Sequence, residues 1–155
     1  MNFQVTGLDA EPFRRLYGLD QAALQLHGAV PYVADANPGF PCRVSLRDAE
    51  PGERLLLLNY QHQPVSTPYR SSHAIFVIDG ATPATAHPGE VPDMLAGRQL
   101  SVRAFDALGM MTDALVTDGS KAADVFHQML ESGQNAYLHV HTAARGCYLA
   151  RIIRS

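Results

Sequence analysis

The sequence predicts an α+β protein built on an antiparallel or mixed β-sheet, with helices packed mainly on one face of the sheet. Three observations support this class. The length of 155 residues suits one domain, expected to span 1–155. Short apolar segments of strand character are separated by turns rich in Gly, Pro, Asp and Asn. These segments do not alternate regularly with helices, which disfavours a doubly wound parallel sheet.

The first third of the chain predicts strands on either side of a broken helical hairpin. Phe3–Leu8 has the character of a short strand. Asp9 can cap a first short helix that is stopped at Gly18, and a second helix is expected from Asp20 to Gly28. Another strand is expected from Val30 to Ala34.

The centre of the chain predicts two strands and a long loop. The continuous Leu run in Arg54–Tyr60 indicates a strand buried on both faces, although periodicity alone leaves a helix open. The polar stretch Gln61–Ser72 is expected to interrupt the sheet before a strand at Ala74–Ile78. Gly80–Gly97 predicts an irregular excursion with one helical turn near Val91–Leu95. Such a loop can be a lid, a binding loop or a dimer arm, or simply a surface wrap.

The last third predicts four strands and the best helix of the chain. Strands are expected at Leu100–Phe105 and Ala114–Thr117, and a final hairpin at Ala136–Ala143 and Cys147–Arg154. The helix runs from about Ser120 to Ser132. Its apolar residues recur at helical spacing, at Ala122, Val125, Phe126, Met129 and Leu130.

Charge and composition exclude several partners. The net charge is −3 and Lys121 is the only lysine, so no basic patch is available for nucleic acid or for an anionic membrane. The N-terminal residues lack the pattern of a signal peptide, which predicts a cytoplasmic protein with Cys42 and Cys147 as reduced thiols.

The first candidate site is the strand segment His139-Val140-His141. Alternation along a strand places both imidazoles on one face, where two nitrogens can ligate a divalent metal such as zinc. A three-residue loop ending at Gly146 would pair His141 with Leu149 and His139 with Arg151, and would bring Cys147 to the same face. A two- or four-residue loop would send Cys147 and Arg151 to the other face. A half-buried polar patch without metal is the alternative interpretation.

The second candidate site lies between the two central strands. His62 extends one face of its strand, and Tyr69-Arg70-Ser71-Ser72-His73 leads into the next. Arg70 can bind a carboxylate or phosphate, Ser71 can donate a further hydrogen bond, and His73 can act as acid, base or ligand. The simpler interpretation is a polar turn that satisfies its own backbone.

Cys42 is a third, weaker candidate. The cation of Arg43 beside it would favour the thiolate, and a histidine partner would complete a nucleophilic pair. A small buried hydrophobic side chain is the usual role of such a cysteine.

Several of these motifs together resemble a known bacterial family, domain of unknown function 1203. The segments that carry the resemblance are Pro38–Arg43, Leu57–His62, Pro68–Val77, Leu100–Asp106, Tyr137–His141 and Gly146–Cys147. The resemblance covers nearly the whole chain. It implies membership of that family and implies no activity.

Two hypotheses of function follow, and whether the protein is an enzyme stays open. The first is a small-ligand or metal site, hydrolytic if catalytic, in which arginines bind an anionic group. Its residues are Arg43, His62, Tyr69, Arg70, Ser71, His73, His139, His141, Cys147 and Arg151. The second is a non-catalytic homodimer that associates through a sheet edge or through the Gly80–Gly97 loop.

Overall fold

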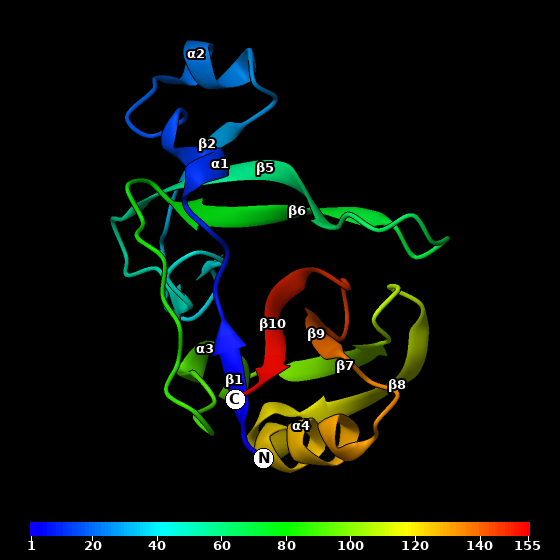
Figure 1. Cartoon of the computed structure of the whole chain (residues 1–155). Coiled ribbons are helices and arrows are strands. Elements are labelled where there is room, and N and C mark those ends of the chain that lie inside the picture. Colours follow the sequence, from blue (N-terminus) through cyan, green and yellow to red (C-terminus); the bar gives the residue numbers. More distant parts are fainter.

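Ten strands form two separate sheets in the computed structural model, which describes all 155 residues (Figure 1). Sheet I has the order β1-β10-β9-β7-β8 and is antiparallel throughout. Sheet II has the order β2-β5-β6-β3-β4 and contains one parallel pair, β3 with β6. The predicted α+β class is confirmed, and the division of the strands into two sheets is a feature that no local sequence pattern marks.

The strands are β1 (Phe3–Thr6), β2 (Val30–Val33), β3 (Pro41–Cys42), β4 (Arg47–Asp48), β5 (Arg54–Gln63), β6 (Ser71–Ile78), β7 (Gln99–Phe105), β8 (Met111–Asp118), β9 (Tyr137–Thr142) and β10 (Tyr148–Arg154). The helices are α1 (Glu11–Arg14), α2 (Gln21–Gln25), α3 (Asp93–Ala96) and α4 (Ala122–Glu131), with a 3-10 turn η1 (Gly119–Lys121) before α4. None of these helices is long and apolar enough to cross a membrane.

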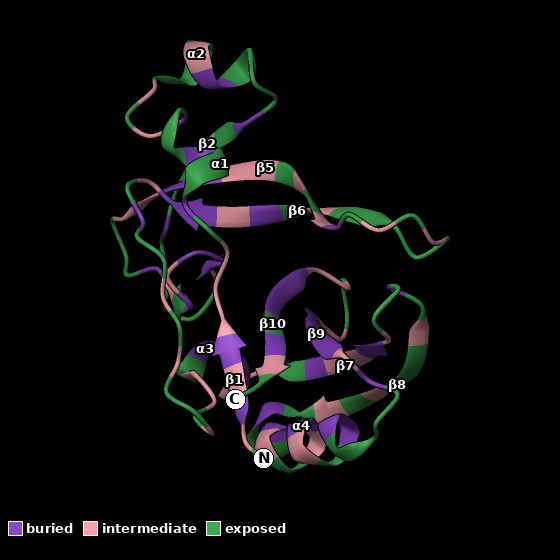
Figure 2. Ribbon diagram, in the orientation of Figure 1, coloured by how far each residue is buried: buried purple, intermediate pink, exposed green.

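The main core lies between sheet I and α4, which covers one face of that sheet (Figures 1 and 2). Phe126 and Leu130 of α4 are buried against Leu138 and Val140 of β9. Since residues alternate along a strand, the neighbours Tyr137, His139 and His141 point to the opposite face, toward sheet II. As a result, the face of sheet I that carries His139 and His141 lies between the two sheets.

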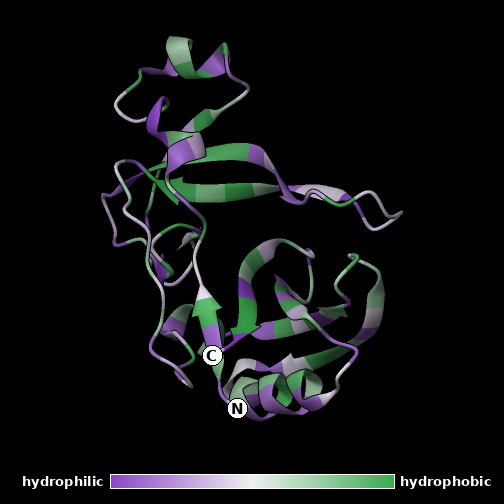
Figure 3. Cartoon of the chain, in the orientation of Figure 1, coloured by the Kyte–Doolittle hydropathy of each residue, from purple (hydrophilic) through white to green (hydrophobic).

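Sheet II carries a smaller core beneath the first two helices. Phe13 of α1 packs with Leu55 and Ile75, and Leu24 of α2 packs with Leu56. Asp20 caps α2, because its carboxylate accepts a hydrogen bond of 2.8 Å from the backbone N–H of Ala23. Figure 3 shows that β5 and β6 are hydrophobic over this core and become hydrophilic toward the hairpin that joins them.

The β5–β6 hairpin corrects the predicted interruption of the sheet. β5 continues to Gln63 and β6 begins at Ser71, so only the segment between them is irregular. The longer strands carry the end of the hairpin over sheet I (Figure 1). The hydroxyl of Thr67 donates a hydrogen bond to the carbonyl of Gly109, in the β7–β8 turn. His62 is therefore on a strand of sheet II, held above sheet I.

The Gly80–Gly97 loop wraps the edge of sheet I. The backbone N–H groups of Ala86 and Gly89 donate to the carbonyls of Val5 and Phe3 on β1. These bonds occupy the edge of a strand that would otherwise be open. The helical turn expected near Val91–Leu95 is α3, at Asp93–Ala96.

The final hairpin contains a bulge that the sequence does not predict. His139 pairs with Arg151, as expected, but Tyr148 rather than Leu149 stands opposite His141. The register shifts between Tyr148 and Ala150, so Leu149 is the extra residue and is buried in the main core. The expected pairing of His141 with Leu149 is thus wrong.

Candidate metal centre

Three histidine side chains meet between the two sheets. His139 and His141 come from β9 of sheet I, and His62 comes from β5 of sheet II. One ring nitrogen of each histidine lies within 4.8 Å of the others. His139 and His141 are each only 2% exposed. These residues form what is here called the histidine cluster: His62, His139 and His141.

The hydrogen bonds of the cluster leave nitrogen acceptors free. Nδ1 of His141 lies 2.8 Å from the carbonyl oxygen of Gly146. Because a carbonyl only accepts, Nδ1 carries the proton and Nε2 keeps its lone pair. A backbone carbonyl holds metal-bound histidines in the same way. The Nδ1 atoms of His62 and His139 are buried and have no hydrogen-bond partner.

Burial keeps all three imidazoles uncharged near neutral pH. It lowers the pKa of His62 to about 4, with smaller contributions from the neighbouring His73 and Arg103. Burial, followed by the neighbouring histidines, lowers the pKa of His139 to about 2. Burial also lowers the pKa of His141 to about 3, against the opposing effect of its bond to Gly146. A neutral imidazole is the form that ligates metals.

Aromatic rings enclose the cluster. Tyr148 is stacked on His62 with 4.8 Å between the ring centroids and 9° between the planes. Phe105 and Tyr137 lie against His139 at centroid distances of 5.1 and 5.2 Å. These contacts shield much of the imidazole surface from water.

The separation of the nitrogens is close to that of a metal site. Tetrahedral zinc with Zn–N bonds of about 2.1 Å needs nitrogens about 3.4 Å apart. The upper limit of 4.8 Å in the cluster exceeds this value by an amount that modest ring rotations can close. The arrangement can therefore present three imidazole nitrogens to one ion.

The charged neighbours of the cluster are cations. Arg103 and Arg151 stand opposite His139 from the two adjacent strands, β7 and β10. Burial lowers the pKa of Arg103, whose guanidinium has no carboxylate partner. No carboxylate is among the groups that perturb the pKa values of the three histidines.

The structure brings some of the sequence-predicted residues to this place. His139, His141, Arg151 and His62 are there, and His73 lies near enough to lower the pKa values of His62 and His141. Tyr69 reaches the edge of the site, with its ring against Phe105.

Other predicted residues are placed elsewhere. Cys147 pairs with Thr142 because of the bulge, and its thiol is not among the converging ligand atoms. Arg43 is buried, and its guanidinium donates to the carbonyls of Tyr148 and Pro41, which joins the two sheets. Arg70 is exposed, and the hydroxyl of Ser71 donates to the carbonyl of Tyr69, as in the simpler polar-turn interpretation.

Cys42 has a structural environment. It is fully buried in the core of sheet II, and its sulfur accepts the backbone N–H groups of Ser45 and Ile78. None of the three clustered histidines lies in that core. These surroundings match the buried hydrophobic role rather than a nucleophile.

Sequence reasoning missed Arg103, Ser101 and Tyr148. Arg103 and Ser101 alternate with the core residues of β7, which shows from the sequence alone that both face away from α4. Their position beside the histidines depends on the pairing of β7 with β9, which no local signal reveals. Tyr148 reaches the cluster only because of the bulge at Leu149.

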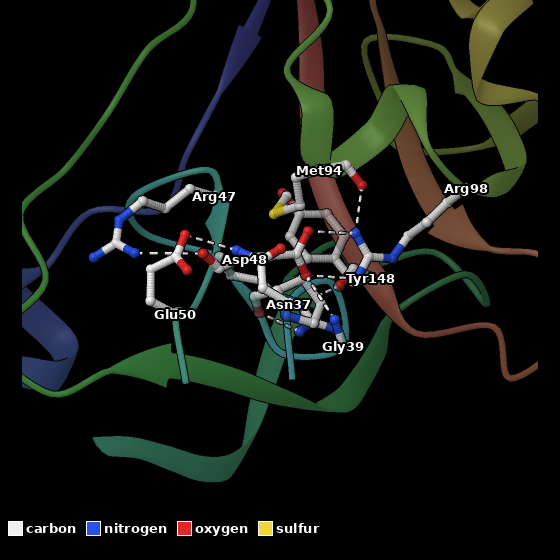
Figure 4. Close-up of polar contacts among 10 residues, drawn as sticks. Asn37, Gly39, Arg47, Asp48, Glu50, Met94, Arg98 and Tyr148 are labelled. Carbon is white, nitrogen blue, oxygen red and sulfur yellow. Dashed lines mark hydrogen bonds and ion pairs between the residues drawn. The ribbon is translucent and has the colours of Figure 1, made fainter. Parts of the chain in front are cut away.

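A separate polar pocket lies around Asp48 (Figure 4), and none of the three clustered histidines lines it. Its volume is about 400 Å³. Both Asp48 carboxylate oxygens accept from Arg98, at 2.7 and 2.9 Å, and Glu50 accepts from Asn37. The charged groups of this pocket are thus largely paired within the protein, whereas Nδ1 of His62 and Nδ1 of His139 have no hydrogen-bond partner.

The fold and this site define an α+β protein with a buried histidine cluster between two sheets. Residues 39–154 match the model of a family described as a protein of unknown function, DUF1203. The chain belongs to this family, as the sequence resemblance indicated. No curated protein and no solved structure matches the chain.

Proposed function

We propose that the protein binds one divalent transition-metal ion through His62, His139 and His141. Zinc is the first metal that we propose. The observation that carries the proposal is the convergence of three buried, uncharged imidazoles from two different sheets. Zinc, copper, iron and nickel all accept imidazole ligands, and zinc sites with three histidines commonly leave a fourth position open.

The unsatisfied nitrogens support the proposal energetically. A buried polar atom without a partner costs roughly 1–3 kcal/mol. The cluster contains two such atoms, Nδ1 of His62 and Nδ1 of His139. Coordination of an ion would offset the cost of bringing the three imidazoles together out of water.

Metal-assisted hydrolysis is the reaction class that this ligand set suits best. A metal with an open position lowers the pKa of a bound water to near neutrality. The oxygen of that water would add to the carbonyl or phosphoryl centre of an ester, and the leaving group would depart with a proton. Three neutral ligands leave the full positive charge of the ion to act on the water and the substrate.

Elemental analysis of tag-free protein, purified without chelators and then titrated with zinc, tests the proposal. We expect one zinc per chain in the wild type. His139→Ala, His141→Ala and His62→Ala should each lower zinc affinity by at least about 10-fold, because each removes one ligand. His62→Ala is the most informative variant, since His62 lies near the end of β5 and is only partly buried.

His87→Ala is the matched control, because His87 is an exposed histidine of the Gly80–Gly97 loop. It should bind zinc as the wild type does. Circular dichroism of each variant separates loss of ligand from loss of fold. Absence of stoichiometric zinc in a folded wild-type protein, with no uptake on titration, would overturn the proposal.

Association of two copies through sheet II is a second candidate function. β2 is an edge strand of that sheet, and its Val30, Tyr32 and Val33 are 48%, 42% and 63% exposed. Exposed apolar edge strands commonly pair with another chain. Sedimentation at micromolar concentration should then show a dimer that Val33→Lys dissociates, and a clean wild-type monomer would contradict this function.

A further inference from the structure

We propose that Arg103, with Arg151 on the opposite side of His139, forms a binding site for an anionic group of the substrate. The inference rests on the proposed metal site and names the class of ligand that would occupy its open position. That class is a small molecule with a carboxylate or phosphate group.

The strand register places both arginines beside the histidine cluster. Arg103 of β7 and Arg151 of β10 both stand opposite His139 of β9. Paired residues of adjacent strands point to the same face of a sheet, so both guanidinium groups lie on the histidine face. One cation thus stands on each side of the central imidazole.

Neither guanidinium is neutralised within the protein. The ion pairs of the structure involve Arg14, Arg47, Arg54 and Arg98. Arg103 makes one hydrogen bond, from Nε to the hydroxyl oxygen of Ser101 at 3.2 Å. The guanidinium carbon of Arg151 lies 4.2 Å from the centroid of the Tyr137 ring. Donors on both side chains remain available for an oxyanion, and a guanidinium binds carboxylates and phosphates with two parallel bonds.

The position of Arg103 is defined by the final hairpin. A Cβ atom at Gly146 would stand 3.9 Å from Nη2 of Arg103, so this end of the guanidinium lies beside Gly146. The carbonyl of Gly146 also orients His141. The same turn therefore lies beside both the Arg103 guanidinium and one of the proposed metal ligands.

The charge balance also favours an anion. Three neutral imidazoles, a divalent ion and two guanidinium groups would carry four positive charges, and no carboxylate perturbs the histidines. A partly buried group of cations without counter-charge is strongly unfavourable. An anionic ligand that bridges the metal and Arg103 would relieve this imbalance.

Isothermal titration with inorganic phosphate and with acetate tests the inference, on both zinc-loaded and metal-free full-length protein. We expect zinc-loaded wild type to bind one of these anions, and the stronger binder identifies the headgroup. Arg103→Gln should weaken that binding at least about 10-fold while zinc stoichiometry stays unchanged. Arg151→Gln should have a smaller effect, because Arg151 is exposed. Arg103→Lys should restore part of the affinity.

Arg145→Gln is the matched control, since Arg145 is an exposed arginine of the same hairpin. Equal anion affinity for Arg103→Gln and Arg145→Gln would overturn the anion site. Failure to bind zinc would instead overturn the proposed function. In that case, anion binding by the metal-free protein that depends on Arg103 would still support the arginine site, and its absence would overturn it.

Discussion

At the scale of single residues, the cluster consists of histidines that the folded protein keeps neutral. Burial lowers their pKa values from 6.5 to about 4 for His62, about 3 for His141 and about 2 for His139. Above an ordinary histidine pKa of about 6.5 the folded and unfolded states bind the same number of protons at these sites. As pH falls below that value, the unfolded chain binds protons that the folded histidines do not, so stability is lost.

Metal-free protein should therefore lose stability from about pH 6.5 toward about pH 4, the folded pKa of His62. Each of the three histidines contributes up to about 1.4 kcal/mol per pH unit to the slope of the free energy of unfolding against pH. His139→Phe should remove one such contribution, because phenylalanine fills a similar space and does not titrate. Urea unfolding in the presence of a chelator, at several pH values, measures the slope.

His27→Phe provides the comparison, since His27 is exposed and lies outside the histidine cluster. A slope for His139→Phe equal to that of the wild type would show that His139 is not held neutral by burial.

At the scale of elements, the β9–β10 hairpin positions the site. Gly146 has a φ of 74°, in the left-handed region that disfavours other residues. Its carbonyl oxygen accepts a hydrogen bond of 2.8 Å from Nδ1 of His141, and the bulge at Leu149 presents Tyr148 to His62. A change in this turn should consequently alter both the fold and the metal affinity.

Gly146→Ala should cost about 1–2 kcal/mol of stability, because an Ala in the left-handed region is strained. It should also weaken zinc binding, since the shifted carbonyl no longer orients His141. Gly28→Ala is the matched control: Gly28 has a φ of 70°, has open space around it and lies after α2. The control should lose similar stability and keep its zinc affinity. An equal zinc affinity for the two variants would contradict the orienting role of the turn.

At the scale of the whole molecule, the site depends on the contact between the two sheets. Nε2 of Gln63 donates a hydrogen bond of 2.9 Å to the hydroxyl of Tyr137, and both side chains are buried. This bond crosses from the end of β5 to β9, one residue beyond His62 and two residues before His139. It therefore holds the two parts of the cluster together.

Gln63→Ala should destabilise the protein by about 1–3 kcal/mol, because it leaves the buried Tyr137 hydroxyl without a partner. Zinc affinity should fall as well, since His62 is less firmly held over sheet I. The double variant Gln63→Leu with Tyr137→Phe removes both polar partners and should recover part of the stability in urea unfolding. No recovery in the double variant would show that the hydrogen bond is not the origin of the loss.

Local sequence patterns predicted some features of this molecule, and tertiary packing determined others. Period-two alternation correctly placed His139 and His141 on one face, because β9 is a regular interior strand. The α+β class and the helix at α4 followed from local periodicity. His62 was among the predicted site residues, but no local pattern showed that it meets His139 and His141, since that contact depends on the packing of two sheets. The bulge that places Tyr148 rather than Leu149 opposite His141 depends on the same tertiary packing.

X-ray absorption spectroscopy of zinc-loaded protein tests the proposed metal centre most directly. We expect three imidazole nitrogens at about 2.0–2.1 Å from the metal, plus one lighter ligand such as water or an added anion. His62→Ala should reduce the imidazole count by one, and His87→Ala should not change it. A zinc shell of oxygen atoms without imidazole scattering, unchanged by His62→Ala, would contradict a metal centre built from His62, His139 and His141.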